Sequence, residues 1–414
     1  MSTDQQVATC RSCAAPLTEV FADLGMTPLS NSFLSRERLD GMEPFFPLRA
    51  MVCDRCFLVQ LSQYEEPSAI FSDYVYFSSW STTWVAHAAA FAKRTTAELA
   101  LDERSKVVEI ASNDGYLLQH FVDIGVPVLG VEPAANVAAV AIERGIPTVT
   151  EFFGAELARR LAADHRADLL VGNNVLAHVP DLHDFVAGLE ILLAPGGHIS
   201  MEFPHLLRLM DDCQFDTIYH EHFSYFSLLA VEKVFERHGL ALVDVEQVST
   251  HGGSLRIWAR HAEVAAGTRS ERMDAVLAEE LAAGLGTIEP YRRFAARVPA
   301  EKRDLLSALI EFKRAGLAIV GYGAPAKGNT LLNYCGIGTD LLDFTVDISP
   351  HKQGLFLPGT HIPVLAPDEI GRARPDLVFV LPWNIEAEII ASLSYVREWG
   401  GRFLVRRPQV TVVD

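Results

Sequence analysis

Titratable and aromatic residues are concentrated in one stretch of the chain, residues 215–226. His222 could act there as a general base, because an imidazole with an unperturbed pKa near 6.5 is largely neutral at pH 7. Glu221 could fix the tautomer of that ring or of a neighbour, and Tyr219 could donate a hydrogen bond to a developing oxyanion. His178 is expected to project toward the same site, although it could instead cap or pack. These residue types favour proton abstraction. The His-x-His pair could alternatively bind a metal, but it lacks the His-Glu-x-x-His spacing.

A strand followed by a polar turn, Val107–Gly115, predicts a ligand crevice at the carboxyl end of that strand. The next apolar strand, residues 126–131, ends in Glu132, which is placed to accept hydrogen bonds from both ribose hydroxyls. The first turn has one glycine, Gly115, and not the Gly-x-Gly-x-x-Gly that a pyrophosphate needs. S-adenosylmethionine has a ribose and no phosphate, so this turn favours the methyl donor; a βαβ unit without a ligand is the alternative. The candidate cofactor-binding residues are Glu109, Ala111, Asn113, Asp114, Gly115, Glu132, Asn173 and Asn174.

A second strand, glycine turn and helix start lie at residues 316–330, with Gly321 and Gly323 in the turn and Lys327 after it. Helix amides together with an ammonium group form an anion site. Asp347, at the end of the following strand, lies where a sugar hydroxyl could be held. The alternative is a duplicated nucleotide-type fold that binds nothing.

Four of the six cysteines form two Cys-x-x-Cys pairs near the amino terminus, Cys10 with Cys13 and Cys53 with Cys56. Such pairs are typical of a zinc site, and four thiolates leave no open coordination position, so the metal would be structural. Reduced or redox-active cysteines are the alternative. Cys213 and Cys335 stand alone and are expected to be buried thiols.

Strands and helices alternate from about residue 102 to 262, which predicts a doubly wound α/β sheet. Two strands at 240–245 and 254–259 have so short a connection that they must be antiparallel. A parallel sheet closed by such a hairpin is the Rossmann-like arrangement of class I methyltransferases. We therefore expect a zinc-binding module at 1–68, a methyltransferase domain at 69–262, a helical linker at 263–314 with helices at 271–285 and 301–315, and a second Rossmann-like domain at 315–414.

The composition excludes several classes of protein. The net charge of −18 over 414 residues argues against nucleic acid as a partner, because affinity for nucleic acid depends on Lys and Arg neutralising phosphates. No uncharged apolar run approaches the roughly 18 residues of a membrane span, and the first residues lack the features of a signal peptide. A cytoplasmic location is expected, and a monomer is one compatible state.

Taken together, the motifs resemble the nucleotide-sugar C-methyltransferases of antibiotic deoxysugar pathways. The resemblance rests on both cysteine pairs, Glu109–Gly115, Tyr219–Phe223, His251–Gly253 and Gly321–Lys327, and it spans the chain in order. It implies a zinc module, an S-adenosylmethionine domain and a domain that holds the nucleotide of a dTDP-linked 4-keto sugar. Ala111 departs from the family pattern, since many methyltransferases have glycine there. The candidate substrate-binding residues are His251, Gly252, Gly253, Tyr322, Lys327, Asp347, Lys352 and Asn384.

The resemblance also implies a mechanism in which His222 removes the proton α to the 4-keto group and the resulting enolate is methylated. Tyr219, Glu221, His178 and one of Tyr74 and Tyr76 would surround the sugar. The two tyrosines lie in the aromatic segment 71–81, which is either a lid or an interdomain packing segment. The alternatives are a zinc-ribbon RNA-binding methyltransferase and an NAD-dependent enzyme. The sequence does not indicate whether C3 or C5 is methylated.

Overall fold

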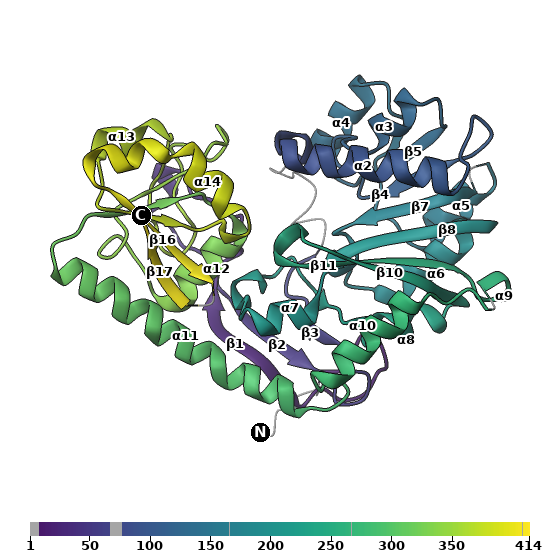
Figure 1. Cartoon of the computed structure of the whole chain (residues 1–414), viewed down its shortest axis with the longest axis horizontal. Helices are drawn as coiled ribbons and strands as arrows, with labels where there is room; N and C mark the ends of the chain where they lie inside the picture. The colour runs from purple at the N-terminus through teal and green to yellow at the C-terminus, as the bar shows by residue number, and fades with distance from the viewer. Residues whose placement is uncertain (1–7, 67–76, 165, 266, 408) are drawn as a thin grey trace.

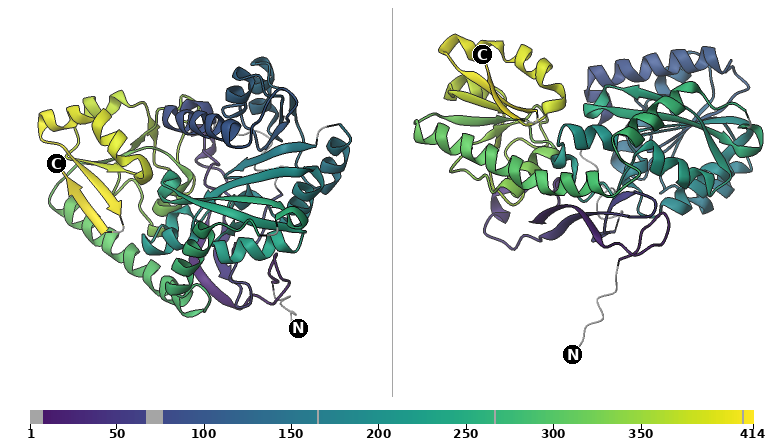
Figure 2. Two further views of the ribbon diagram at one scale, coloured as in Figure 1. Left: turned by 45° about the vertical axis from the view of Figure 1, so that its right-hand side comes forward. Right: turned by 60° about the horizontal axis from the view of Figure 1, so that its bottom comes forward.

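The structure, a computed structural model, describes residues 8–66, 77–164, 166–265, 267–407 and 409–414. Its strands form three sheets, of four, seven and six strands. Figure 1 shows the seven-stranded and six-stranded sheets in two neighbouring units, with the small sheet and the long helix α11 (Glu289–Arg314) below them. The two other directions in Figure 2 show the small sheet beneath the junction of the larger units.

The small antiparallel sheet is built from the cysteine-rich region and from one distant segment. Its order is β1-β2-β3-β9, with β1 at Glu19–Thr27, β2 at Phe46–Val52, β3 at Val59–Leu61 and β9 at Ser224–Tyr225. Strands β2 and β3 lie on either side of the second cysteine pair. The sequence did not predict β9, which satisfies backbone groups on the edge of β3. The small sheet is therefore joined directly to the segment that contains His222.

The seven-stranded sheet has the order β10-β11-β8-β7-β4-β5-β6. Its strands are β4 (Val107–Ile110), β5 (Val128–Val131), β6 (Thr148–Val149), β7 (Ala167–Asn173), β8 (Leu193–Pro204), β10 (Leu240–Val248) and β11 (Ser254–His261). The five strands from β8 to β6 are parallel, and β10 and β11 are antiparallel. This confirms the predicted class I methyltransferase arrangement with its terminal hairpin.

Helices cover both faces of this sheet, and several begin at a side chain that caps free amides. Ser81 accepts a hydrogen bond from the first turn of α2, Asp181 from that of α6, and Ser227 from that of α8. The helices of this unit are α2 (Thr82–Glu98), α3 (Leu118–Asp123), α4 (Ala135–Glu143), α5 (Ala155–Ala162), α6 (Leu182–Leu192), α7 (Leu206–Asp211) and α8 (Leu228–Glu236).

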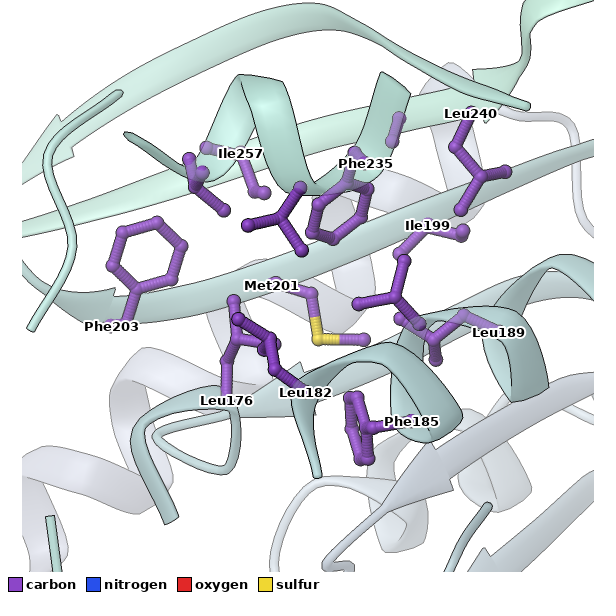
Figure 3. Close-up of a cluster of buried hydrophobic side chains, with 14 of the residues drawn as sticks. Leu176, Leu182, Phe185, Leu189, Ile199, Met201, Phe203, Phe235, Leu240 and Ile257 are labelled. Atoms are coloured by element: carbon purple, nitrogen blue, oxygen red, sulfur yellow. The ribbon is translucent and has the colours of Figure 1, made fainter. Parts of the chain in front are cut away.

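One apolar layer fixes the position of β8, whose carboxyl end leads into the candidate site. Figure 3 shows Met201 of β8 between Leu182 and Phe185 on one side and Phe235 on the other, with Phe203 of the same strand at one end of the cluster. These side chains are almost fully buried. Truncating a buried side chain of this size typically costs about 2–5 kcal/mol, so this layer holds the strand rigidly against α6 and α8.

Two helices link the larger units, and one is longer than predicted. Helix α10 (Glu271–Ala282) agrees with the sequence, but α11 begins at Glu289, well before the expected start at residue 301. Pro290 lies in its first turn, where a missing N–H has no intrahelical acceptor, so this proline starts the helix and does not break it. Helix α11 packs against β1, α12 and β17, and so spans the small sheet and the last unit.

The six-stranded sheet has the order β14-β13-β12-β15-β16-β17, parallel except for β17. Its strands are β12 (Ile319–Tyr322), β13 (Thr345–Val346), β14 (Val364–Leu365), β15 (Leu377–Val380), β16 (Arg402–Arg407) and β17 (Gln409–Val413), and its helices are α12 (Ala326–Cys335), α13 (Asp368–Ala373) and α14 (Glu386–Ser392). The second Rossmann-like unit predicted from the glycine turn is therefore present. Within the described parts of the chain, no helix is long and apolar enough to span a membrane.

Candidate active site

The turn after β4 adopts left-handed backbone at three positions. Ala111, Asn113 and Gly115 have φ of 56°, 50° and 79°. A Cβ on Gly115 would lie 2.3 Å from Cδ1 of Ile146, so only glycine fits without displacing that side chain. The turn therefore brings the backbone close to the carboxyl edge of the sheet, where a ligand of this fold binds.

Acidic groups surround this turn. Burial raises the pKa of Glu109 well above its usual value, and the charges of Glu132 and Asp114 raise it further. Glu132 lies at the tip of β5 as predicted, but its two oxygens already accept hydrogen bonds from the amides of Asn113 and Ala134, both at 2.9 Å. The carboxylate thus shapes the turn as well as offering its remaining lone pairs to a ribose.

The side chains of Asn113 and Asp114 hold the segment that enters α2. Asn113 Oδ1 accepts a hydrogen bond from the amide of Ser78 at 2.8 Å, and Asp114 Oδ2 accepts one from the hydroxyl of Ser79. Arg144 forms an ion pair with Asp114 at 3.5 Å. The sequence offered no signal for Ser78 or Ser79, because these contacts join segments that are far apart along the chain.

At the tip of β7, Asn173 donates a hydrogen bond to the hydroxyl of Tyr116 at 3.0 Å. Asn174 is left-handed, with φ of 58°, and its buried Oδ1 has no hydrogen-bond partner among the described residues. Trp84 of α2 stacks on Tyr116 with ring centroids 5.9 Å apart. Tyr116 and Trp84 were not predicted.

These residues fit S-adenosylmethionine. The glycine-dependent turn, the acids Glu109 of β4 and Glu132 at the tip of β5, and the unpartnered oxygens of Asp114 and Asn174 provide hydrogen-bond acceptors for a donor with a ribose.

The predicted catalytic residues His178, Tyr219 and His222 form one cluster. The ring of His222 lies 4.0 Å from that of Tyr219 and 4.7 Å from that of His178, measured between centroids. His222 Nδ1 lies 2.9 Å from the backbone oxygen of Thr217, an acceptor, so Nδ1 carries the proton and Nε2 has the lone pair. Thr217, and not Glu221, therefore holds the tautomer of His222, whereas the backbone of Glu221 forms a hydrogen bond with the neighbouring ring of His178.

Glu221 instead binds a residue from the amino-terminal module. Its Oε1 accepts a hydrogen bond from Nδ2 of Asn31 at 2.6 Å. Burial raises the pKa of Glu221 to about 7, while Asn31 and the charge of Lys352 lower it. Asn31 was missed because only the folded chain brings it to this site.

Burial lowers the pKa of His222 well below its usual value, and His178, Lys327 and His251 lower it further. Burial also lowers the pKa of His178 to about 4, and that of His251 to about 4 with a contribution from Lys327. The three imidazoles are therefore neutral at pH 7. Lys327 belongs to the six-stranded unit, so an ammonium group from that unit lies within electrostatic reach of His222.

In the six-stranded unit, Lys327 donates a hydrogen bond to Oδ1 of Asn384 at 2.7 Å and lies 4.5 Å from the ring centroid of Trp383. Burial lowers the pKa of Lys327 to about 8, and the charge of Asp216 opposes that shift. Asp347 accepts a hydrogen bond from the amide of Ala324 at 2.7 Å. The structure thus brings together Lys327 and Asn384 at the start of α12.

Two other predicted residues of this unit have different contacts. Lys352 donates a hydrogen bond to the oxygen of Ala324 at 2.9 Å and lies 3.7 Å from Asp347. Tyr322 packs with the apolar cluster around Val346 and Phe403, on the opposite face from α12.

The predicted substrate-binding glycines lie at the junction of the two larger units. A Cβ on Gly252 would lie 2.6 Å from the ring of Trp383, and one on Gly253 would lie 2.8 Å from Cγ of Arg208. Trp383 in turn donates a hydrogen bond to the buried Asp216 at 2.7 Å. Gly252 and Gly253 therefore allow close packing at the junction. Tyr74 and Tyr76 lie outside the described residues.

The four cysteines converge. The sulfurs of Cys10, Cys13, Cys53 and Cys56 all lie within 4.8 Å of one another, and none is in a disulfide. The amide of Gln60 donates a hydrogen bond to Sγ of Cys10 at 3.1 Å. Four sulfurs at this spacing fit a tetrahedral zinc ion, whose Zn–S bonds are about 2.3 Å long.

Known proteins resemble this chain along nearly its whole length. Family models match at residues 10–71 (a zinc binding domain), 84–245 (a methyltransferase domain) and 249–408 (a C-methyltransferase C-terminal domain). The C-methyltransferase NovU of Streptomyces niveus is 38% identical over 409 residues, which cover 98% of this chain and 96% of that protein.

Two similar solved structures each cover less than half of this chain. They are an S-adenosylmethionine-dependent methyltransferase of Clostridium acetobutylicum (10% identical, 42% of this chain and 89% of that one, TM-score 0.34) and the Trm112 methyltransferase complex of Haloferax volcanii (14% identical, 43% and 96%, TM-score 0.33). Scores this low support no argument. The family assignment rests on the match to NovU and on the three family models, which agree with the site described above: the chain belongs to the family of S-adenosylmethionine-dependent C-methyltransferases.

Proposed function

We propose that the protein transfers a methyl group from S-adenosylmethionine to a carbon α to the 4-keto group of a dTDP-linked deoxysugar. His222 removes the proton from that carbon, and the enolate that remains is the nucleophile. A ketone next to the C–H bond makes this possible because it delocalises the negative charge onto oxygen.

One observation carries the proposal: the ammonium group of Lys327 lies 4.5 Å from the ring centroid of Trp383, and that ring packs against Gly252, the residue after His251. Lys327 follows the glycine turn of the second Rossmann-like unit, where helix amides and a lysine favour an anion such as a pyrophosphate. The imidazoles belong to the methyltransferase unit. A substrate with a diphosphate at one end and an acidic C–H bond at the other would therefore meet both groups.

The chain's own residues prepare the proton transfer. Thr217 holds the proton of His222 on Nδ1, so Nε2 is available as the base. Tyr219 lies against the same ring and is placed to donate a hydrogen bond to the enolate oxygen. The lowered pKa makes His222 a weak base, so stabilisation of the enolate must supply part of the driving force. The nearby charge of Lys327 contributes to it.

Bound S-adenosylmethionine supplies an electrophilic methyl group on a sulfonium ion. The turn after β4 and the acids at the strand tips would hold it against the imidazole cluster. Holding two reactants in contact can contribute up to about 7–11 kcal/mol, and a positioned base contributes roughly 100- to 10,000-fold.

The direct test is to incubate the protein with labelled methyl donor and a panel of dTDP-4-keto sugars. We expect the wild type to transfer label to at least one sugar carbon and His222→Ala to lose at least 100-fold in kcat while S-adenosylmethionine still binds. His198→Ala is the control, since this half-buried histidine lies on β8 beside Arg260 and outside the cluster. Near-normal turnover by His222→Ala would remove His222 from the mechanism, and absence of label on every sugar would refute the substrate class.

The pH profile separates His222 from Glu221 as the base. A base must be unprotonated, so activity falls as the pH drops through its pKa. With His222 as the base, kcat/KM does not fall between pH 8 and pH 6.5 and falls only below that, because the pKa of His222 is lowered. With Glu221 as the base, the fall occurs near pH 7, and Glu221→Gln abolishes activity.

A further inference from the structure

Arg11 lies between the first two cysteines of the metal cluster, but its side chain reaches the backbone next to both catalytic histidines. Its guanidinium donates hydrogen bonds to the backbone oxygens of Val179 at 3.4 Å and Pro180 at 3.1 Å, and to that of Leu61. Val179 and Pro180 directly follow His178. One side chain therefore holds the segment that presents the first histidine.

The same guanidinium also contacts the segment that presents His222. It lies 5.5 Å from the ring centroid of Phe223, the next residue in the chain. The amide of Leu61 donates a hydrogen bond to the oxygen of Phe223 at 3.0 Å, and the amide of Phe223 donates one to the oxygen of Ala177 at 2.7 Å. Strands β3 and β9 then pair directly. The two histidine segments are thus joined to each other and to Arg11.

The backbone of Arg11 is fixed by the metal cluster. Its amide donates a hydrogen bond to Oε1 of Gln60 at 2.9 Å, and Gln60 in turn donates one to Sγ of Cys10. A planar guanidinium presents its donors in a rigid fork, so it can bind several carbonyl oxygens in one geometry. A lysine offers one ammonium group and cannot do so.

We propose that Arg11 is a positioning residue for methyl transfer, through which the cysteine module sets the geometry of the His178–His222 pair. Arg11 acts through the backbone around Val179 and Phe223. The inference rests on the proposed function insofar as that pair performs the chemistry. It gives the amino-terminal module a role in the reaction beyond its own stability.

The chain contains a matched control at the other cysteine pair. Arg55 lies between Cys53 and Cys56, but its side chain is 78% exposed and its nearest charged partner is Asp54 at 3.8 Å. Both arginines thus flank the metal cluster, and only Arg11 reaches the histidine segments.

The experiment compares Arg11→Met, Arg11→Lys and Arg55→Met for zinc content, affinity for S-adenosylmethionine and kcat. We expect Arg11→Met to keep its zinc and its donor affinity within twofold and to lose roughly 10- to 100-fold in kcat, since a displacement of about 1 Å can have that effect. Arg11→Lys should recover little of the lost kcat, and the kcat of Arg55→Met should match that of the wild type. In a further variant, Arg11→Ala, added guanidinium should partly restore kcat.

A second readout needs no substrate. The NMR signals of the His178 and His222 rings should shift in Arg11→Met and stay unchanged in Arg55→Met. Unchanged ring signals together with wild-type kcat in Arg11→Met would overturn the proposal. Loss of zinc or of the folded state in both Arg11→Met and Arg11→Lys would also overturn it, because Arg11 would then be purely structural. If the wild type methylated no sugar, the proposed function would fail while the ring signals still tested Arg11.

Discussion

The turns after β4 and β12 have the same architecture and opposite charge. Each follows the first strand of a Rossmann-like unit, and in each an acid at the tip of the next strand accepts a hydrogen bond from an amide of the turn. Glu132 binds the amide of Asn113 at 2.9 Å, and Asp347 binds that of Ala324 at 2.7 Å. The acid at the strand tip therefore stabilises the turn in both units, whatever the ligand.

The surroundings of the two turns differ. At the first turn, the charges of Asp114 and Glu132 raise the pKa of the buried Glu109. In the second, Lys352 lies 3.7 Å from Asp347, and Lys327 is at the start of the helix. A fold used twice in one chain thus presents acidic side chains at one turn and lysines at the other, as the proposed pairing of a sulfonium donor with a diphosphate requires. The charged residues of each turn can be mutated separately from those of the other.

The largest effect is expected for Lys327→Met. A hydrogen bond between an ammonium group and a phosphate contributes about 1.5–3 kcal/mol, so the affinity for dTDP should fall roughly 10- to 150-fold. Calorimetric titration with dTDP measures this, and titration with S-adenosylmethionine should give the wild-type value. Lys313→Met is the control, because Lys313 lies on α11 and is paired with Asp343, away from the turn. Weaker donor binding with unchanged dTDP binding would reverse the assignment of the two sites.

A smaller effect is expected for the strand-tip acids. Glu132→Gln keeps one oxygen acceptor and loses the charge, so the affinity for S-adenosylmethionine should fall about 5- to 30-fold, or about 1–2 kcal/mol, while that for dTDP stays unchanged. Asp347→Asn should show the opposite pattern. Both ligands are measured on both variants. If either substitution weakened both ligands equally, the two turns would not be independent sites.

Local patterns in the sequence were enough to predict the two Rossmann-like units and the acids at the strand tips. Glu132 and Asp347 each follow an apolar strand, and the hairpin of β10 and β11 follows from its short connection. The start of α11 was misplaced because Pro290 was interpreted as a break between helices, whereas it occupies the first turn of one.

The remaining features of the site depend on contacts between distant segments. Asn31 reaches Glu221, Ser78 reaches Asn113, and β9 completes a sheet that begins two hundred residues earlier in the chain. The spacing of residues within one segment does not encode such contacts, because the polar residues of each segment give no sign of which distant segment they will meet. The partner that holds the His222 tautomer was missed for a related reason: the acceptor is a backbone oxygen of Thr217, which no side-chain motif reveals.

The smallest expected effect concerns the one departure from the family pattern, Ala111. Its φ of 56° is a left-handed conformation that costs an alanine about 1–2 kcal/mol, and the greater freedom of an unfolded glycine offsets about 0.4–1 kcal/mol of the relief. Ala111→Gly should therefore raise the free energy of unfolding by about 0.5–1 kcal/mol, measured by urea denaturation.

Ala100 is also left-handed, with φ of 51°, and is exposed at the end of α2, so Ala100→Gly should give a similar gain. Only Ala111→Gly should also bind S-adenosylmethionine more tightly, by a few-fold, because removing the methyl group lets the backbone approach the donor. Equal donor affinities in the two variants would show that Ala111 strains the turn without touching the ligand.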